Sequence, residues 1–170
     1  MTYQKAKLAL IGVLSLLFLL FNAYLLPNEV EELSKIAGYD IKVLDLRMSY
    51  SEYDVNKFLT DIGDEGRDIY LYTSEVLDTI YPFIYGSLFM LILFELSRMR
   101  NQFWRLSSLT PVLAVVFDLI ENHGFRQMLY AYPDLASSQI EMNSIFTSLK
   151  WLFVSITIAL VIILLIKKLS

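Results

Sequence analysis

The chain has 170 residues, of which 56% are hydrophobic and only 19% are charged, and it contains no cysteine. This composition is too apolar for an ordinary soluble domain of that length and indicates one compact membrane unit. The lack of cysteine excludes disulfides, thiol redox chemistry and cysteine-ligated metals. The formal charge of −4 excludes little by itself, but basic residues never interleave with aromatic residues on a polar face, so no nucleic-acid partner is expected.

The first apolar segment, residues 8–26, is long enough to cross a bilayer, because about 19 helical residues extend about 28 Å. Pro27 follows it directly and is expected to end the helix. Lys5 and Lys7 before the segment would also suit a signal peptide. However, the apolar stretch is too long, and Phe21-Asn22-Ala23 lacks the small residue required two positions before a cleavage point. We therefore expect an uncleaved first span.

The long loop after this span is expected to form a short helical cap at about residues 49–79. Ser51 and Asp54 have the spacing of a capping box at a helix start. One apolar face follows at helical spacing, formed by Val55, Phe58, Leu59 and Ile62. Gly63 is typical of a helix end, and a second helix is expected to begin at Asp64 and run into the next span. The cap would lie on the membrane surface or cover the bundle, and a lid over a substrate opening is the alternative.

Hydropathy places further spans at residues 80–97 and 145–166. The bounds of the third span follow from the length that a helix needs to cross the membrane. Residues 106–117 give about 18 Å of helix, well short of a hydrocarbon core of about 30 Å. Extending this span to residue 127 supplies the missing length, so Asp118, Glu121 and Asn122 are expected below the membrane surface. The predicted fold class is therefore an all-α membrane protein: a bundle of four transmembrane helices with a short helical cap in the first loop.

Lysine and arginine predict the orientation of this bundle. They gather in the N-terminal tail, in the loop between the second and third spans, and at the C-terminus: Lys5 and Lys7; Arg98, Arg100 and Arg105; Lys167 and Lys168. Four spans put all three segments on one side, and the positive-inside rule makes that side cytoplasmic. The acidic first loop is then expected on the outer side.

Polar side chains are expected at one depth, in the outer half of the bilayer, in all four spans. They are Asn22 in the first span; Asp78, Tyr81 and Tyr85 in the second; Asp118, Glu121, Asn122, His123 and Arg126 in the third; and Lys150 in the fourth. An acid exposed to lipid near mid-helix costs about 2.5–3.5 kcal/mol. Asp118 and Glu121 are therefore expected to face the bundle interior or a pocket. Lys150 and Arg126 are their expected partners, with Arg47 and Arg67 of the loop as further candidates.

Three functions fit this set of residues. The preferred one is an outward-opening acidic pocket that binds a lipid-like or small amphiphilic molecule, with or without chemistry on it. In the catalytic case Asp118, Glu121 and His123 are the candidate acid–base residues. The second is an accessory or assembly subunit, with partner membrane proteins, whose polar cluster fixes the helix register. The third is a proton or ion path.

The path hypothesis is the weakest, because the inner half of the bundle offers only Glu95, which is expected to pair with Arg98 or Arg100. No cofactor and no metal are expected. A metal site of Asp118, Glu121 and His123 is only weakly indicated, because Glu121 and His123 are two residues apart and point about 160° from one another on a helix.

Overall fold

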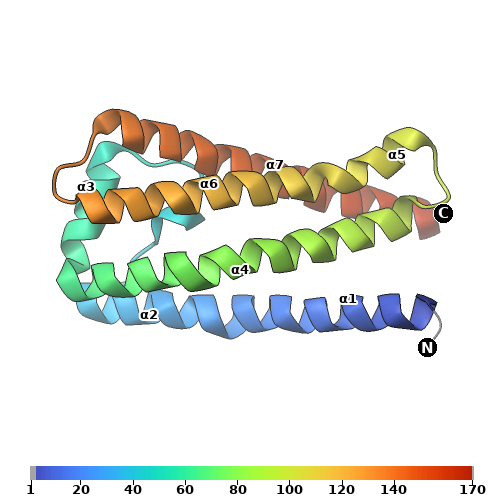
Figure 1. The fold of residues 1–170 in the computed structure, drawn as a ribbon, viewed down its shortest axis with the longest axis horizontal. Helices are drawn as coiled ribbons and strands as arrows, with labels where there is room; N and C mark the ends of the chain where they lie inside the picture. The colour runs from blue at the N-terminus through green and yellow to red at the C-terminus, as the bar shows by residue number, and fades with distance from the viewer. Residues whose placement is uncertain (1–2, 170) are drawn as a thin grey trace.

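The computed structural model describes residues 3–169 and is helical, with no strand in that range (Figure 1). The elements are α1 (Tyr3–Leu20), the π-helical turn η1 (Phe21–Leu25), α2 (Leu26–Ala37), the 3-10 turn η2 (Leu44–Leu46), α3 (Glu52–Asp61), α4 (Gly63–Ser97), α5 (Gln102–Leu106), the 3-10 turn η3 (Ser107–Leu109), α6 (Thr110–Ala131) and α7 (Ser137–Leu169). Four helical segments are long and apolar enough to cross a membrane: Tyr3–Ala37, Gly63–Ser97, Gln102–Ala131 and Ser137–Lys168. Each of the four expected spans falls within one of them.

The four segments lie side by side, with α1 and α2 along one edge of the bundle (Figure 1). α1 packs along α4, and α6 packs against both α4 and α7. α1 contains no buried residue, and the first buried side chain of its segment is Phe21. The first helix is therefore the most weakly packed part of the bundle.

Pro27 does not end the first helix, so that prediction is wrong. The chain passes through the π-helical turn Phe21–Leu25, in which the Leu26 N–H donates to the Phe21 carbonyl. Pro27 then occupies the first turn of α2, where its missing N–H costs little. The helix continues to Ala37 and ends at Gly38, whose φ of 79° is in the left-handed region.

Pro82 lies inside α4 without ending it. A proline at this position cannot donate to the carbonyl of Asp78, four residues earlier. The side-chain Nδ2 of Asn122 donates to that carbonyl instead, at 2.7 Å. This hydrogen bond replaces the one that Pro82 removes from α4, and it joins α4 to α6.

The expected helix of the long loop is present as α3. Its capping box is formed: the Ser51 N–H donates to Asp54 Oδ2 at 2.8 Å, and the Asp54 N–H donates to Ser51 Oγ at 3.3 Å. Gly63, with φ of 62°, separates α3 from α4, which begins one residue earlier than expected. The apolar face of α3 packs into a cluster with residues of α2, α4, α6 and α7: Leu33, Val55, Phe58, Leu59, Ile62, Tyr70, Phe125, Met128 and Ile140.

The two termini and the α4–α5 connection lie together at the opposite end of the bundle (Figure 1). Lys7 forms an ion pair with Glu95, so the expected pairing of Glu95 with Arg98 or Arg100 is wrong. Arg100 donates instead to the carbonyl of Lys167 at 2.7 Å. The three basic segments predicted to share one side thus meet at one end.

Gly124 and Gly86 lie where helices approach most closely. A Cβ added at Gly124 would lie 1.9 Å from Asn143 Oδ1 of α7, and one at Gly86 would lie 2.3 Å from Val115 Cγ2 of α6. A Cβ added at Gly12 of α1 meets nothing within 4 Å, because no helix of the described chain packs on that side of α1.

Gly124→Ala is expected to lower the free energy of unfolding by roughly 1–3 kcal/mol, the usual cost of overpacking. The added methyl group would push the Asn143 side chain, and with it α7, away from α6. Thermal unfolding of the purified protein in detergent micelles measures the effect. Gly12→Ala is the matched control and should leave the unfolding temperature unchanged or slightly higher. An equal loss in the two variants would contradict this account of the packing.

Candidate functional site: an acidic cavity between the first helix, α4 and α7

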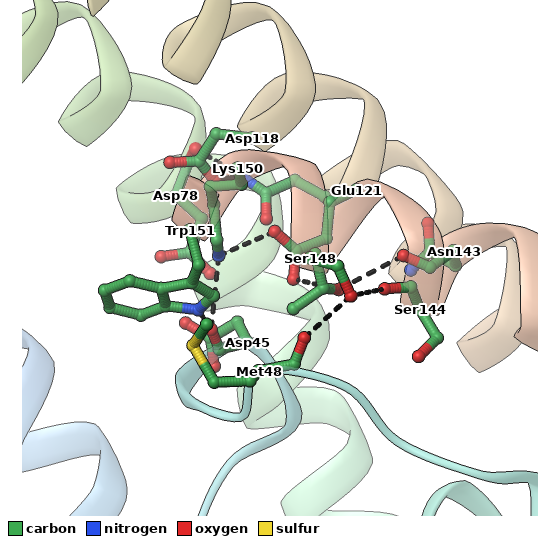
Figure 2. Close-up of polar contacts among 12 residues, drawn as sticks. Asp45, Met48, Asp78, Asp118, Glu121, Asn143, Ser144, Ser148, Lys150 and Trp151 are labelled. Atoms are coloured by element: carbon green, nitrogen blue, oxygen red, sulfur yellow. Dashed lines mark hydrogen bonds and ion pairs between the residues drawn. The ribbon is translucent and has the colours of Figure 1, made fainter. Parts of the chain in front are cut away.

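A buried ion pair joins α6 to α7. Asp118 and Glu121 lie one turn apart on the face of α6 that meets α7, and they are 8% and 0% exposed. Lys150 of α7 is 6% exposed, and its Nζ lies 2.6 Å from Glu121 Oε2 and 3.9 Å from Asp118 Oδ1. Figure 2 shows Lys150 between these acids, with Asp45 and Asp78 on its other side. Lys150 is the partner expected for both acids of α6.

Neutral donors supply most of the remaining hydrogen bonds to Asp118 and Glu121. The Tyr85 hydroxyl of α4 donates to Asp118 Oδ2 at 2.8 Å, and Asn122 Nδ2 lies 3.2 Å from Asp118 Oδ1. Thr147 Oγ1 of α7 donates to Glu121 Oε1 at 2.7 Å. A charged group can stay ionised away from water only when it is paired and hydrogen-bonded in this way. The arrangement therefore keeps two acids and one ammonium together inside the bundle.

The polar cluster continues into the segment between α2 and α3 through Tyr50. The Tyr50 hydroxyl accepts a hydrogen bond from Asn143 Nδ2 at 3.0 Å and lies 3.3 Å from Thr147 Oγ1. Burial raises the pKa of Tyr50 above its ordinary value, so the hydroxyl stays neutral. Tyr50 thus covers the end of the cluster as a hydrogen-bonding group without adding charge.

A cavity of about 290 Å³ lies beside this cluster, between the first helical segment, α4, α7 and the segment that contains η2. One part of its lining is polar and consists of Asn22, Asp45, Asp78, Tyr81, Tyr85, Asp118 and Lys150. The other part is apolar and consists of Phe18, Leu26, Leu46, Pro82, Phe89, Trp151, Val154 and Ile158. A concave space with an apolar wall and a few convergent polar groups is the usual form of a small-molecule site.

The first helix reaches the cavity at its π-helical turn. Asn22 Nδ2 donates to the Tyr81 hydroxyl at 2.8 Å and also to the Phe18 carbonyl at 2.7 Å. The Phe21 ring stacks on Tyr81 with centroids 5.3 Å apart. Single π-helical turns inside α-helices are frequent at functional sites. This one brings the only polar side chain that the first segment contributes to the cavity.

The structure brings together six of the ten residues predicted for the site, since Asn22, Asp78, Tyr81, Tyr85, Asp118 and Lys150 all line the cavity. Glu121 and Asn122 stand directly behind its wall and hold Lys150 and Asp118. His123 is exposed and Arg126 is half-buried, and neither lines the cavity.

The arginines expected to pair with the acids have other partners. Arg126 donates to the Ser74 carbonyl at 2.8 Å. Arg47 binds Asp54 at 3.0 Å, and Arg67 donates to the Leu59 carbonyl at 2.7 Å. Arg47 and Arg67 are thus satisfied by nearby residues of the loop, and Arg126 is satisfied by the backbone of α4.

Asp45 and Trp151 belong to the site but were missed. The Asp45 carbonyl accepts hydrogen bonds from Lys150 Nζ at 3.2 Å and from Trp151 Nε1 at 2.9 Å (Figure 2). Asp45 lies in the 3-10 turn η2, which is too short for a periodic pattern to indicate which way a side chain points. Trp151 follows Lys150 directly, and that neighbour relation was the one available signal.

Within residues 3–169, no group of three or more histidine, cysteine, aspartate or glutamate side chains is arranged to hold a metal ion. Aspartates 45, 78 and 118 share the cavity, but they are spread around Lys150 (Figure 2). The site's chemistry is that of carboxylates, phenols and one ammonium.

Lys150→Met is expected to lower stability by about 3–5 kcal/mol, because it leaves the Glu121 carboxylate buried without its cation. Adding Glu121→Gln should recover most of that loss, since an amide in this position can still bond Thr147 and carries no charge. Thermal unfolding of the two single variants and the double variant forms a double-mutant cycle. Additive losses in the double variant would show that the pair is not coupled.

The candidate site is therefore a cavity, lined by both polar and apolar side chains, that lies beside a buried ion pair. Comparison with known protein families, with curated proteins and with solved structures finds no match for this chain.

Proposed function

We propose that this chain is an integral membrane protein that binds a small lipid-like or amphiphilic molecule in the cavity between the first helix, α4 and α7. The observation that carries the proposal is the two-sided lining of the cavity, with carboxylates, phenols and an ammonium on one part and aromatic and aliphatic side chains on the other. Its volume of about 290 Å³ is close to the lower limit of about 300 Å³ for ligand pockets.

The outer surfaces of the helices that border the cavity support a membrane location. Large apolar side chains are exposed on the first helix and on α7, among them Leu16, Leu19, Leu20, Leu152, Ile158 and Ile162. Exposed apolar area of this extent suits contact with hydrocarbon. An amphiphile could then place its polar head in the cavity and its tail between the first helix and α7.

The positions of the basic residues support an orientation with both termini in the cytoplasm. Lys7, Arg100 and Lys167 meet at the end of the bundle that carries the termini. The positive-inside rule favours that end as cytoplasmic. The end that carries α3 would then face outward, and α3 with its apolar cluster would form the predicted cap.

Binding accounts for the cavity better than a purely structural cluster does. The Lys150–Glu121 pair and the Thr147 hydrogen bond are sufficient to fix α6 against α7. Neither contact requires the cavity beside it, which is lined by several further polar side chains. An accessory-subunit role therefore explains Glu121 but leaves the acid-lined space beside it without a purpose.

The geometry gives less support to catalysis or to ion conduction. Of the three catalytic candidates only Asp118 lines the cavity, since Glu121 is fully buried behind it and His123 is exposed. Toward the termini the cavity is bordered by apolar side chains such as Phe89 and Ile158. The charged pair beyond them, Lys7 with Glu95, is already neutralised.

Val154→Trp should fill the cavity and remove a bound amphiphile, because this side chain forms part of the apolar wall. Mass spectrometry of the protein purified in mild detergent is expected to detect an amphiphile bound to the wild type and at least tenfold less in the variant. Leu152→Trp, at a half-exposed position of the same helix outside the cavity, is the matched control and should retain it. Equal retention in the two variants, or a wild type that binds no amphiphile, would contradict the proposal.

The orientation can be tested with single cysteines, since the chain contains none of its own. Lys42→Cys, between α2 and α3, should react with a membrane-impermeant maleimide applied to intact cells. Met99→Cys, in the connection after α4, is 93% exposed and should react only after the cells are permeabilised. The reverse pattern would invert the topology.

A further inference from the structure

The cavity wall carries more acidic than basic side chains. Asp45, Asp78 and Asp118 line it together with one cation, Lys150. That ammonium is already engaged by Glu121 at 2.6 Å and lies 3.9 Å from Asp118. The pairing leaves the charges of Asp45 and Asp78 without a counter-ion within 4 Å in the described part of the chain.

Asp45 and Asp78 also lack hydrogen-bond donors. Asp45 Oδ1 is enclosed by protein and accepts no hydrogen bond. The backbone carbonyl of Asp78 is used by Asn122, but no described residue donates to its carboxylate. Buried polar atoms are nearly always paired, and one left unpaired costs about 1–3 kcal/mol or more when it is charged. Asp45 Oδ1 is buried without a donor, and the half-buried Asp78 carboxylate has none from the described residues, so donors to both can come from a molecule in the cavity that they line.

The rest of the lining suits a positively charged group. Four aromatic residues are among the lining, Phe18, Tyr81, Phe89 and Trp151, and cations are attracted to the faces of aromatic rings. The Tyr81 ring stacks on Phe18 and Phe21, so Phe89 and Trp151 are the better candidates for such a contact. The Lys150 ammonium itself lies 5.6 Å from the centroid of the Trp151 ring. An anionic head would instead face the carboxyl groups of three aspartates. The acidic side chains and the aromatic rings of the lining therefore both favour a cation over an anion.

We infer that the molecule bound in this cavity is a cationic amphiphile, whose ammonium head donates hydrogen bonds to Asp45 and Asp78. This inference rests on the proposed function and specifies its ligand class. At about 30 Å³ for each water-sized group, 290 Å³ holds roughly ten such groups. The head and the first few carbons therefore fit inside, and a longer tail must leave between the first helix and α7.

The test compares three ten-carbon probes, decylammonium, decanol and decyl sulfate, added to the purified chain in maltoside micelles. Calorimetry and the shift of the unfolding temperature measure binding. Decylammonium is expected to bind at least tenfold more tightly than decanol, and decyl sulfate should give no shift. Raising the salt concentration should weaken decylammonium binding, because attraction between charges is screened.

Two variants connect this selectivity to the partnerless acids. Asp45→Asn and Asp78→Asn should each weaken decylammonium binding at least tenfold. Neither should lower the unfolding temperature of the ligand-free protein, because each removes a charge that has no partner. Glu141→Gln, which removes an exposed acid of α7, is the matched control and should bind decylammonium as the wild type does.

The outcomes separate the two proposals. Tighter binding of decanol or decyl sulfate, or unchanged decylammonium binding in both aspartate variants, would overturn the cationic class and leave amphiphile binding intact. If none of the three probes binds and no amphiphile co-purifies with the wild type, both proposals fail.

Discussion

The structure depends on one constraint: the enclosed carboxylate of Glu121 must stay beside the ammonium of Lys150, the one cation within 4 Å of it among the described residues. Glu121 is fully enclosed, and removing its partner would leave an uncompensated charge there. The pair fixes the register of α6 against α7. That register places Asp118, one turn from Glu121, on the wall of the cavity and brings Trp151 beside Asp45. The chemical character of the cavity thus follows from a single interhelical contact.

Backbone groups around the site also need hydrogen-bond partners. Pro82 interrupts the hydrogen bonds of α4, and Asn122 of α6 donates to the carbonyl that is left free. On the other side of the cavity, the π-helical turn brings Asn22 against Tyr81. Both irregularities occur where polar side chains converge. Departures from regular helix in the first segment and in α4 are therefore part of the site's construction.

Much of the fold could be predicted from the sequence, because hydrophobic length and periodicity are local properties. The four apolar segments, the capping box of Ser51 and the end of α3 at Gly63 are such features. The sequence also predicted that Asn22, Tyr81, Asp118 and Lys150 lie at the same depth along their spans, and all four line the cavity.

Errors arose where tertiary contacts decide. Glu95 has arginines close by in the sequence but pairs with Lys7, from the far end of the chain. Pro27 would end an isolated helix, but a preceding π-helical turn accommodates it. Asp45 lies in the three-residue turn η2, which is too short for any periodicity to show that its carboxylate belongs to the site.

The short connection between α6 and α7, residues 132–136, has a consequence for the order of assembly. Glu121 and Lys150 belong to consecutive helices, so they can neutralise each other as soon as that hairpin closes. If the helices span a membrane as proposed, hydrocarbon then receives a dipole in place of two separate ions, at a much smaller energetic penalty. The first helix is synthesised earliest, but with Phe21 as its first buried contact it has little to hold it until α4 is in place. Because Phe18, Asn22 and Leu26 of this segment line the cavity, its docking on α4 closes that side of the site.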